Sequence, residues 1–177
     1  MAYEGDHLSE YGDVVVVSLN HRLNILGYLD LSAYGEKYYN SANVGNADMV
    51  AALHWIQDNI AGFGGDPGNV TLFGQSGGGM KVYSLMNTPA AEGLFHKGII
   101  QSGVIEEGKK EAEDDGTAIV EALLTELKLE SVEDLETIPY YFLAEAYNKV
   151  SPKLQEKGLY VGGEPRAIHG MPVIRAE

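Results

Sequence analysis

The segment Gly74-Gln75-Ser76-Gly77-Gly78 places a serine between two glycines, one lying two residues before it and one two residues after it. This G-x-S-x-G spacing is typical of a nucleophile elbow, a sharp turn that exposes a serine hydroxyl for attack on an acyl carbonyl. Glycine is needed because larger side chains at those positions would clash within the turn. The spacing therefore predicts Ser76 as the nucleophile of an acyl-transfer reaction, held in a strained turn with φ positive or nearly so.

The same turn also predicts a site for the oxygen anion that such an attack creates. The backbone N–H of Gly77, directly after the serine, is a candidate oxyanion-hole donor, and Gly74, Gln75 and Gly78 complete the turn. A phosphate-binding loop is the alternative for a glycine-rich turn between a strand and a helix. No G-K-[ST] follows the turn, however, and the formal net charge of -14 disfavours an anionic ligand.

An elbow requires a strand before the serine and a helix after it. Short apolar runs bounded by glycines, and apolar residues at helical spacing, satisfy this requirement. We expect strands at residues 14–19, 70–73 and 98–103, and helices at residues 47–60 and 80–86. Alternating strands and helices predict right-handed crossovers, a parallel sheet and an α/β fold class.

The character of the chain changes after Val104. Acidic residues outnumber lysines strongly between Ile105 and Glu136, and apolar spacing predicts amphipathic helices at about residues 115–127 and 132–150. A solvated acidic surface is the simple interpretation, and a docking surface for a basic partner is the alternative. A last short strand is expected at residues 171–174. With 177 residues, we expect one domain, comprising a sheet core at residues 1–104 and an acidic helical segment at residues 105–170.

Composition excludes several classes of function. The chain has 26 Asp and Glu against 12 Lys and Arg, which disfavours nucleic acid and anionic lipid as partners. It has no cysteine, hence neither disulfides nor a thiolate metal site, and we expect no metal and no cofactor. The N-terminal residues lack the pattern of a secretory signal and the longest apolar run is short, so a cytoplasmic protein is expected.

Long stretches around the elbow carry a more specific pattern than the motif itself. They are Gly12 to Val17, Asn20 to Asn24, Ala51 to Ile56, Asn59 to Ser76, Gly93 to His96, and Gln101 to Gly103. Together they resemble the type-B carboxylesterase family, which includes cholinesterases and para-nitrobenzyl esterases. The similarity is dense over residues 3–103 and loose beyond them.

The resemblance implies a partial α/β-hydrolase fold and a carboxylic-ester hydrolase, a serine esterase. It implies that Ser76 accepts the acyl group and that Gly77 donates to the oxyanion. The family usually has alanine at position 77 and often glutamate at position 75. Neither departure removes a catalytic group, because position 77 acts through its backbone. Arg22 and Asp48 match positions that suggest an ion pair or a helix anchor, and Ser102 matches a position near the elbow.

The family also needs a histidine base, an acid that orients it, and a His-Gly-Gly oxyanion segment. We expect these, with the N-terminal strands and the C-terminal part of the fold, to be missing from this chain. Each histidine is better explained as a surface or packing residue; these are His7, His21, His54, His96 and His169. Glu177 follows the last expected strand but is too close to Pro172 to match the family's acid. The chain alone is therefore expected to be nearly inactive.

Two interpretations of function follow. In the first, the chain is an esterase fragment that acts on a small-molecule ester once its missing parts are supplied. In the second, it is a non-catalytic remnant or interaction module of the esterase fold. The family's strand between the segments at residues 14–19 and 70–73 is not found. We therefore expect these segments to pair directly, the first segment to leave the sheet, or a homodimer or complementing fragment to fill the gap. Dimerisation through strands is the arrangement we favour.

Overall fold

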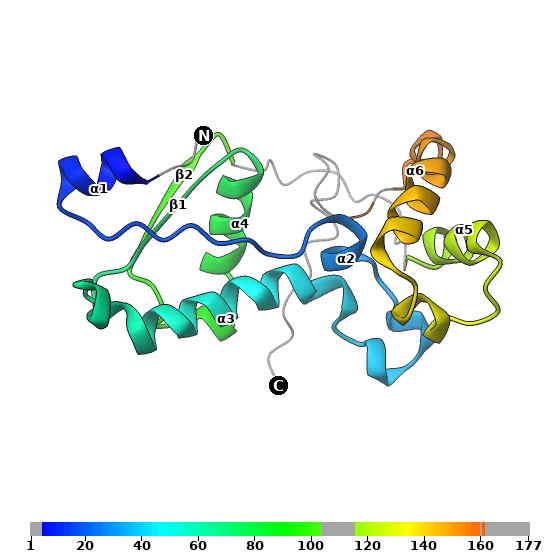
Figure 1. Ribbon diagram of the computed structural model, residues 1–177, viewed down its shortest axis with the longest axis horizontal. Helices are drawn as coiled ribbons and strands as arrows, with labels where there is room; N and C mark the ends of the chain where they lie inside the picture. The colour runs from blue at the N-terminus through cyan, green and yellow to red at the C-terminus, as the bar shows by residue number, and fades with distance from the viewer. Residues whose placement is uncertain (1–4, 104–115, 160, 162–177) are drawn as a thin grey trace. The chain divides into compact units, whose positions relative to one another are not determined.

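The protein is described by a computed structural model, which covers residues 5–103, 116–159 and 161. These residues form two compact units. The first contains residues 5–22 and 45–103, and the second contains residues 23–44, 116–159 and 161. The α/β fold class is confirmed, with two parallel strands and flanking helices (Figure 1). The expectation of a single domain stays a prediction.

The sheet of the first unit is formed by β1 (Thr71–Gln75) and β2 (Lys97–Gln101), which pair in parallel. The register joins Thr71 to Lys97 at one end and Gln75 to Gln101 at the other. The crossover contains α4 (Gly77–Met86) and the short helix η5 (Pro89–Ala91). Both strands therefore end beside the start of α4, as expected for a nucleophile elbow (Figure 1).

Among the described residues, one face of this sheet is covered and the other is exposed. Leu72 of β1 packs in an apolar cluster with Leu53 of α3 (Val44–Asn59) and Leu85 of α4. The three-to-four spacing of apolar residues in α3 explains why this helix buries one side against the strands. The opposite face carries Phe73 and Ile99, which are register partners and are each 52% exposed. Parallel sheets usually bury both faces, so this apolar pair is unusual.

The strand expected at residues 14–19 is wrong for this structure. After α1 (Asp6–Gly12), residues 14–23 have no regular secondary structure, and Val14, Val15 and Val17 are 40–46% exposed. β-branched residues favour a strand only when a neighbouring strand accepts their backbone hydrogen bonds. Of the three expected arrangements, the structure shows the one in which this segment leaves the sheet. Pairing with a second copy stays a prediction.

The second unit is helical in the residues that the structure describes. Short helices in its first part are α2 (Asn24–Tyr28), η1 (Ser32–Tyr34), η2 (Glu36–Tyr38) and η3 (Ser41–Asn43). They are followed by α5 (Thr117–Leu127), η6 (Glu133–Glu136) and α6 (Tyr140–Glu156). A core of its own holds them together, and Val120 and Leu123 at its centre are fully buried.

Helices 47–60, 80–86 and 115–127 are confirmed as elements, with α4 starting earlier than expected, at Gly77. The single helix expected at residues 132–150 is wrong, because it is divided into η6 and α6. Pro139 lies between them as the N-cap of α6, and a proline disfavours helical geometry in the residue before it. The strand expected at residues 171–174 lies outside the described residues. Among the residues described, no helix is both long and apolar enough to cross a membrane.

Candidate active site

Ser76 sits at the turn between β1 and α4 with φ 52° and ψ -118°. The positive φ expected there is confirmed. This combination is unfavourable for a residue with a side chain and costs about 1–3 kcal/mol. The turn is held by two backbone hydrogen bonds: the Ser76 N–H donates to the Gln101 carbonyl at 2.7 Å, and the Met80 N–H donates to the Ser76 carbonyl at 3.0 Å. The strained serine is thus fixed both to β2 and to the helix.

The glycines of the motif allow a close approach of backbone to backbone. A Cβ atom at Gly74 would lie 2.4 Å from the carbonyl carbon of Gly78, too near for any real side chain. A Cβ at Gly103 would lie 2.5 Å from the carbonyl carbon of Gly79. At Gly78, by contrast, a Cβ would meet nothing within 4 Å. Glycine is therefore sterically required at positions 74 and 103. The requirement at Gly103 was not predicted from the sequence.

α4 directs its N-terminus at the elbow. Its first residues are Gly77, Gly78 and Gly79, whose N–H groups have no carbonyl partner within the helix. Such unpaired N–H groups, with the positive end of the helix dipole, favour an anion at this point. The position of Gly77 directly after Ser76 is consistent with the oxyanion donor expected there. The catalytic roles of these residues remain proposals.

Lys81 is a second group near the elbow, and sequence reasoning missed it. It lies one turn along α4 from Gly77, and its Nζ is the atom that a Cβ at position 77 would meet, at 4.0 Å. The side chain is half-buried, and no described residue forms a hydrogen bond or ion pair with it. Burial lowers the pKa of Lys81. The available signal was its spacing of four residues from Gly77, which puts both on one helix face.

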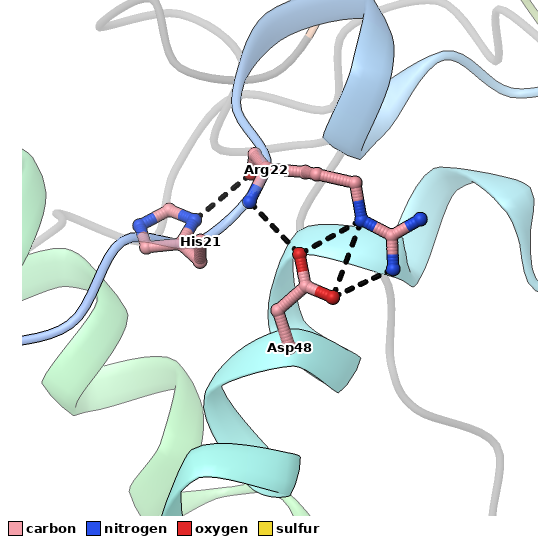
Figure 2. A network of polar contacts seen from close by, with 3 residues as sticks. All are labelled: His21, Arg22 and Asp48. Carbon is pink, nitrogen blue, oxygen red and sulfur yellow. Dashed lines mark hydrogen bonds and ion pairs between the residues drawn. The ribbon is translucent and has the colours of Figure 1, made fainter.

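The ion pair expected between Arg22 and Asp48 is confirmed (Figure 2). Arg22 Nη2 lies 2.6 Å from Asp48 Oδ1, Nε lies 2.9 Å from Oδ2, and the backbone N–H of Arg22 donates to Oδ2 at 2.8 Å. Because the guanidinium donates to it, the pKa of the Asp48 carboxyl is lowered. This pair ties the irregular segment that follows Val14 to the N-terminal half of α3.

His21 precedes this pair, and its imidazole points away from the guanidinium (Figure 2). Its Nδ1 lies 2.9 Å from the carbonyl oxygen of Arg22, which accepts a hydrogen bond when Nδ1 carries the proton. Burial lowers the pKa of His21, the hydrogen bond to Arg22 opposes this, and the nearby Lys81 lowers it further. The residue is half-buried and is held by backbone contacts, which fits a packing histidine.

The other described histidines lie outside the elbow. His7 and His54 are exposed on α1 and α3, and the backbone N–H of Val70 donates to His96 Nδ1 at 3.1 Å. Within the described ranges, neither a histidine nor a carboxylate forms a hydrogen bond with the Ser76 hydroxyl, and no group of three or more His, Asp or Glu could hold a metal. His169 and Glu177 lie outside those ranges. Ser102 has φ 55° and directly follows Gln101, whose carbonyl accepts a hydrogen bond from the Ser76 N–H.

Comparison with known proteins gives one consistent result. A sequence model described as "Carboxylesterase family" matches residues 1–160. Para-nitrobenzyl esterase of Bacillus subtilis is 39% identical over 192 residues, which cover 97% of this chain and 38% of that protein. Liver carboxylesterase 1F of Rattus norvegicus is 50% identical over 103 residues, which cover 58% of this chain and 18% of that protein.

Solved structures agree. An esterase from Clostridium hathewayi, described as able to hydrolyse aliphatic aromatic polyesters, matches with a TM-score of 0.82 and 59% identity. The match covers 90% of this chain and 32% of that one. A carboxylesterase from Geobacillus stearothermophilus matches with a TM-score of 0.76 and 35% identity, over 93% of this chain and 34% of that one. The chain thus spans about a third of the length of these relatives.

Proposed function

The chain belongs to the carboxylesterase family, and from this we propose that it supplies the nucleophile of a carboxylic-ester hydrolase. In the proposed reaction, Ser76 Oγ forms a bond to the ester carbonyl carbon while its proton passes to a base. The alcohol leaves with a proton, and water then releases the acid from the acyl-enzyme. The N–H of Gly77 donates to the oxyanion formed in each half of the reaction.

One observation carries this proposal: the strained dihedral angles of Ser76 between a strand and a helix N-terminus. A serine in an ordinary turn would relax to an allowed conformation. Here backbone hydrogen bonds and glycine packing hold it in an unfavourable one, which is the geometry that exposes a nucleophile. The described residues place no base beside Ser76, so we propose that the base comes from parts of the fold that relatives contain and this chain does not.

A chimera tests the proposal directly. The region of Bacillus subtilis para-nitrobenzyl esterase that matches this chain is replaced by residues 1–177, which supplies the remaining fold. We expect hydrolysis of p-nitrophenyl acetate, and a loss of at least about a thousandfold in Ser76→Ala. Ser84→Ala, on the same helix, is the matched control and keeps its activity. The 177-residue chain alone is expected near background.

Turnover in the chimera that survives Ser76→Ala would overturn the assignment. Robust turnover by the isolated chain, lost in Ser76→Ala, would instead show that a base is available locally. The polyester hydrolysis ascribed to the Clostridium hathewayi esterase extends to this chain only as part of the same proposal, and the chimera can be assayed on an aliphatic aromatic polyester as well.

A second candidate function, an interaction module, is favoured by the uncovered sheet face. Phe73 and Ile99 are exposed side by side, and the segment at residues 14–19 is apolar and does not form a strand. In this proposal the exposed strands bind a second copy of the chain or a complementing segment of the esterase fold. Size-exclusion chromatography with light scattering tests it: we expect a dimer that Phe73→Glu disrupts. A monomer at all concentrations contradicts the dimer.

A further inference from the structure

Lys81 places a positive charge close to the elbow. In a helix, a side chain points back toward the N-terminus and covers the turn before it, so Lys81 extends over Gly77. The 4.0 Å between its Nζ and the Cβ position of residue 77 shows that the extended chain reaches this residue.

Among the described residues, nothing neutralises the charge at this position. No carboxylate in residues 5–103 or 116–159 pairs with Lys81, and burial disfavours its charged form. His21 is the titratable group identified nearby, and the Arg22–Asp48 pair lies next to it. Lys81 lowers the pKa of His21, whereas Asp48 raises it. An anion that forms at the elbow would therefore be the partner that this ammonium lacks.

We propose that the ammonium of Lys81 stabilises the negative charge that develops at the Ser76–Gly77 elbow, and so acts as an electrostatic group of the esterase site. This inference rests on the proposed role of Ser76. A cation that is unpaired in the ground state and paired when the oxyanion forms stabilises the transition state selectively. Lys81 thus complements the backbone N–H groups at the start of α4, which act on the same anion.

A thiol at position 76 reports on this charge without any ester or catalytic base. In Ser76→Cys, the alkylation rate with iodoacetamide follows the thiolate fraction, and its pH profile gives the thiol pKa. The measurement uses the full 177-residue chain. We expect Lys81→Met to raise the thiol pKa and to slow alkylation at pH 7 about three- to tenfold, and we expect Lys81→Arg to restore the rate.

Lys97→Met is the matched control. It removes the same charge, but Lys97 pairs with Thr71 at the opposite end of the sheet, and its Nζ donates to Asn69 Oδ1 at 2.6 Å. We expect no change in the thiol pKa. Lys81→Gln provides a second neutral variant if Lys81→Met does not fold.

Equal alkylation profiles with and without the charge at position 81 would overturn the inference, as would an equal effect of Lys97→Met. This outcome is distinct from failure of the proposed function. An inactive chimera would count against the esterase proposal, whereas the thiol experiment measures only the field at the elbow.

Discussion

The carboxylate of Asp48 accepts hydrogen bonds from two parts of Arg22, its guanidinium and its backbone N–H. A carboxylate that accepts a hydrogen bond from a backbone N–H fixes the path of the main chain as well as the position of a charged side chain. In this unit the fixed path is the segment that leads away from the exposed valines and carries His21 toward α4. Loss of the carboxylate should therefore loosen the backbone as well as remove an ion pair.

Asp48→Asn is expected to lower the free energy of unfolding by about 1–2 kcal/mol at neutral pH. Charge-assisted hydrogen bonds are strong, but the Arg22 side chain is 56% exposed and water screens part of the effect. Chemical denaturation measures the change. Asp58→Asn, an exposed acid on the same helix, is the control and should change stability little. Equal effects of the two substitutions would show that the ion pair is unimportant.

The same pair predicts a dependence of stability on pH. The folded-state pKa of Asp48 is lowered, so its contribution is fully present above its ordinary value of 3.8. As the pH falls through the folded pKa below that value, the unfolded chain has already taken up a proton and the contribution is lost. Denaturation between about pH 2 and 5 should show a smaller acid-induced loss in Asp48→Asn than in the unsubstituted chain. Parallel pH profiles would contradict the assignment.

Gly74→Ala should destabilise the first unit by about 2–3 kcal/mol or more. The added methyl would lie 2.4 Å from the backbone of Gly78, and backbone cannot move aside as a flexible side chain can. Gly78→Ala is the matched control, because open space surrounds that position and alanine favours a helix by up to about 1 kcal/mol. Thermal or chemical unfolding separates the two. A tolerated Gly74→Ala would show that the elbow is looser than described.

Ser76→Gly should be more stable than Ser76→Ala by about 1 kcal/mol. Both remove the hydroxyl, but glycine adopts φ 52° and ψ -118° without strain, whereas alanine keeps the clash of its Cβ. The greater backbone freedom of glycine in the unfolded chain offsets part of the gain. Unfolding curves of the two variants measure the difference. Equal stabilities would mean that the turn at residue 76 is relaxed in solution.

The features that could be predicted from the sequence are those that depend on residues close together in the chain. The glycine spacing around Ser76 gave the elbow and the sign of its φ, and the apolar spacing of α3 and α5 gave those helices. The run Val14 to Leu19 failed because its composition suits a strand but cannot supply the neighbour that a strand needs. The single helix expected at residues 132–150 was wrong because Pro139 separates η6 from α6.

The remaining features depend on which residues lie close together in the folded chain. Gly103 lies 24 residues beyond Gly79, and only the pairing of β2 beside β1 reveals that their backbones touch. Lys81 is the charged residue of α4, and its relation to Gly77 depends on the direction of its side chain. The ion pair of Arg22 with Asp48 was anticipated from the family resemblance; residue spacing alone gave no signal of it.

The open sheet face has a consequence for how this polypeptide behaves while it is being made. Phe73 and Ile99 become adjacent as soon as β1 and β2 pair, yet no described segment covers them. Two paired apolar strands in this state can associate with other nascent chains, and such encounters become more frequent at higher concentration. The yield of soluble chain should therefore fall as expression rises, and chaperones that hold apolar strands should improve it.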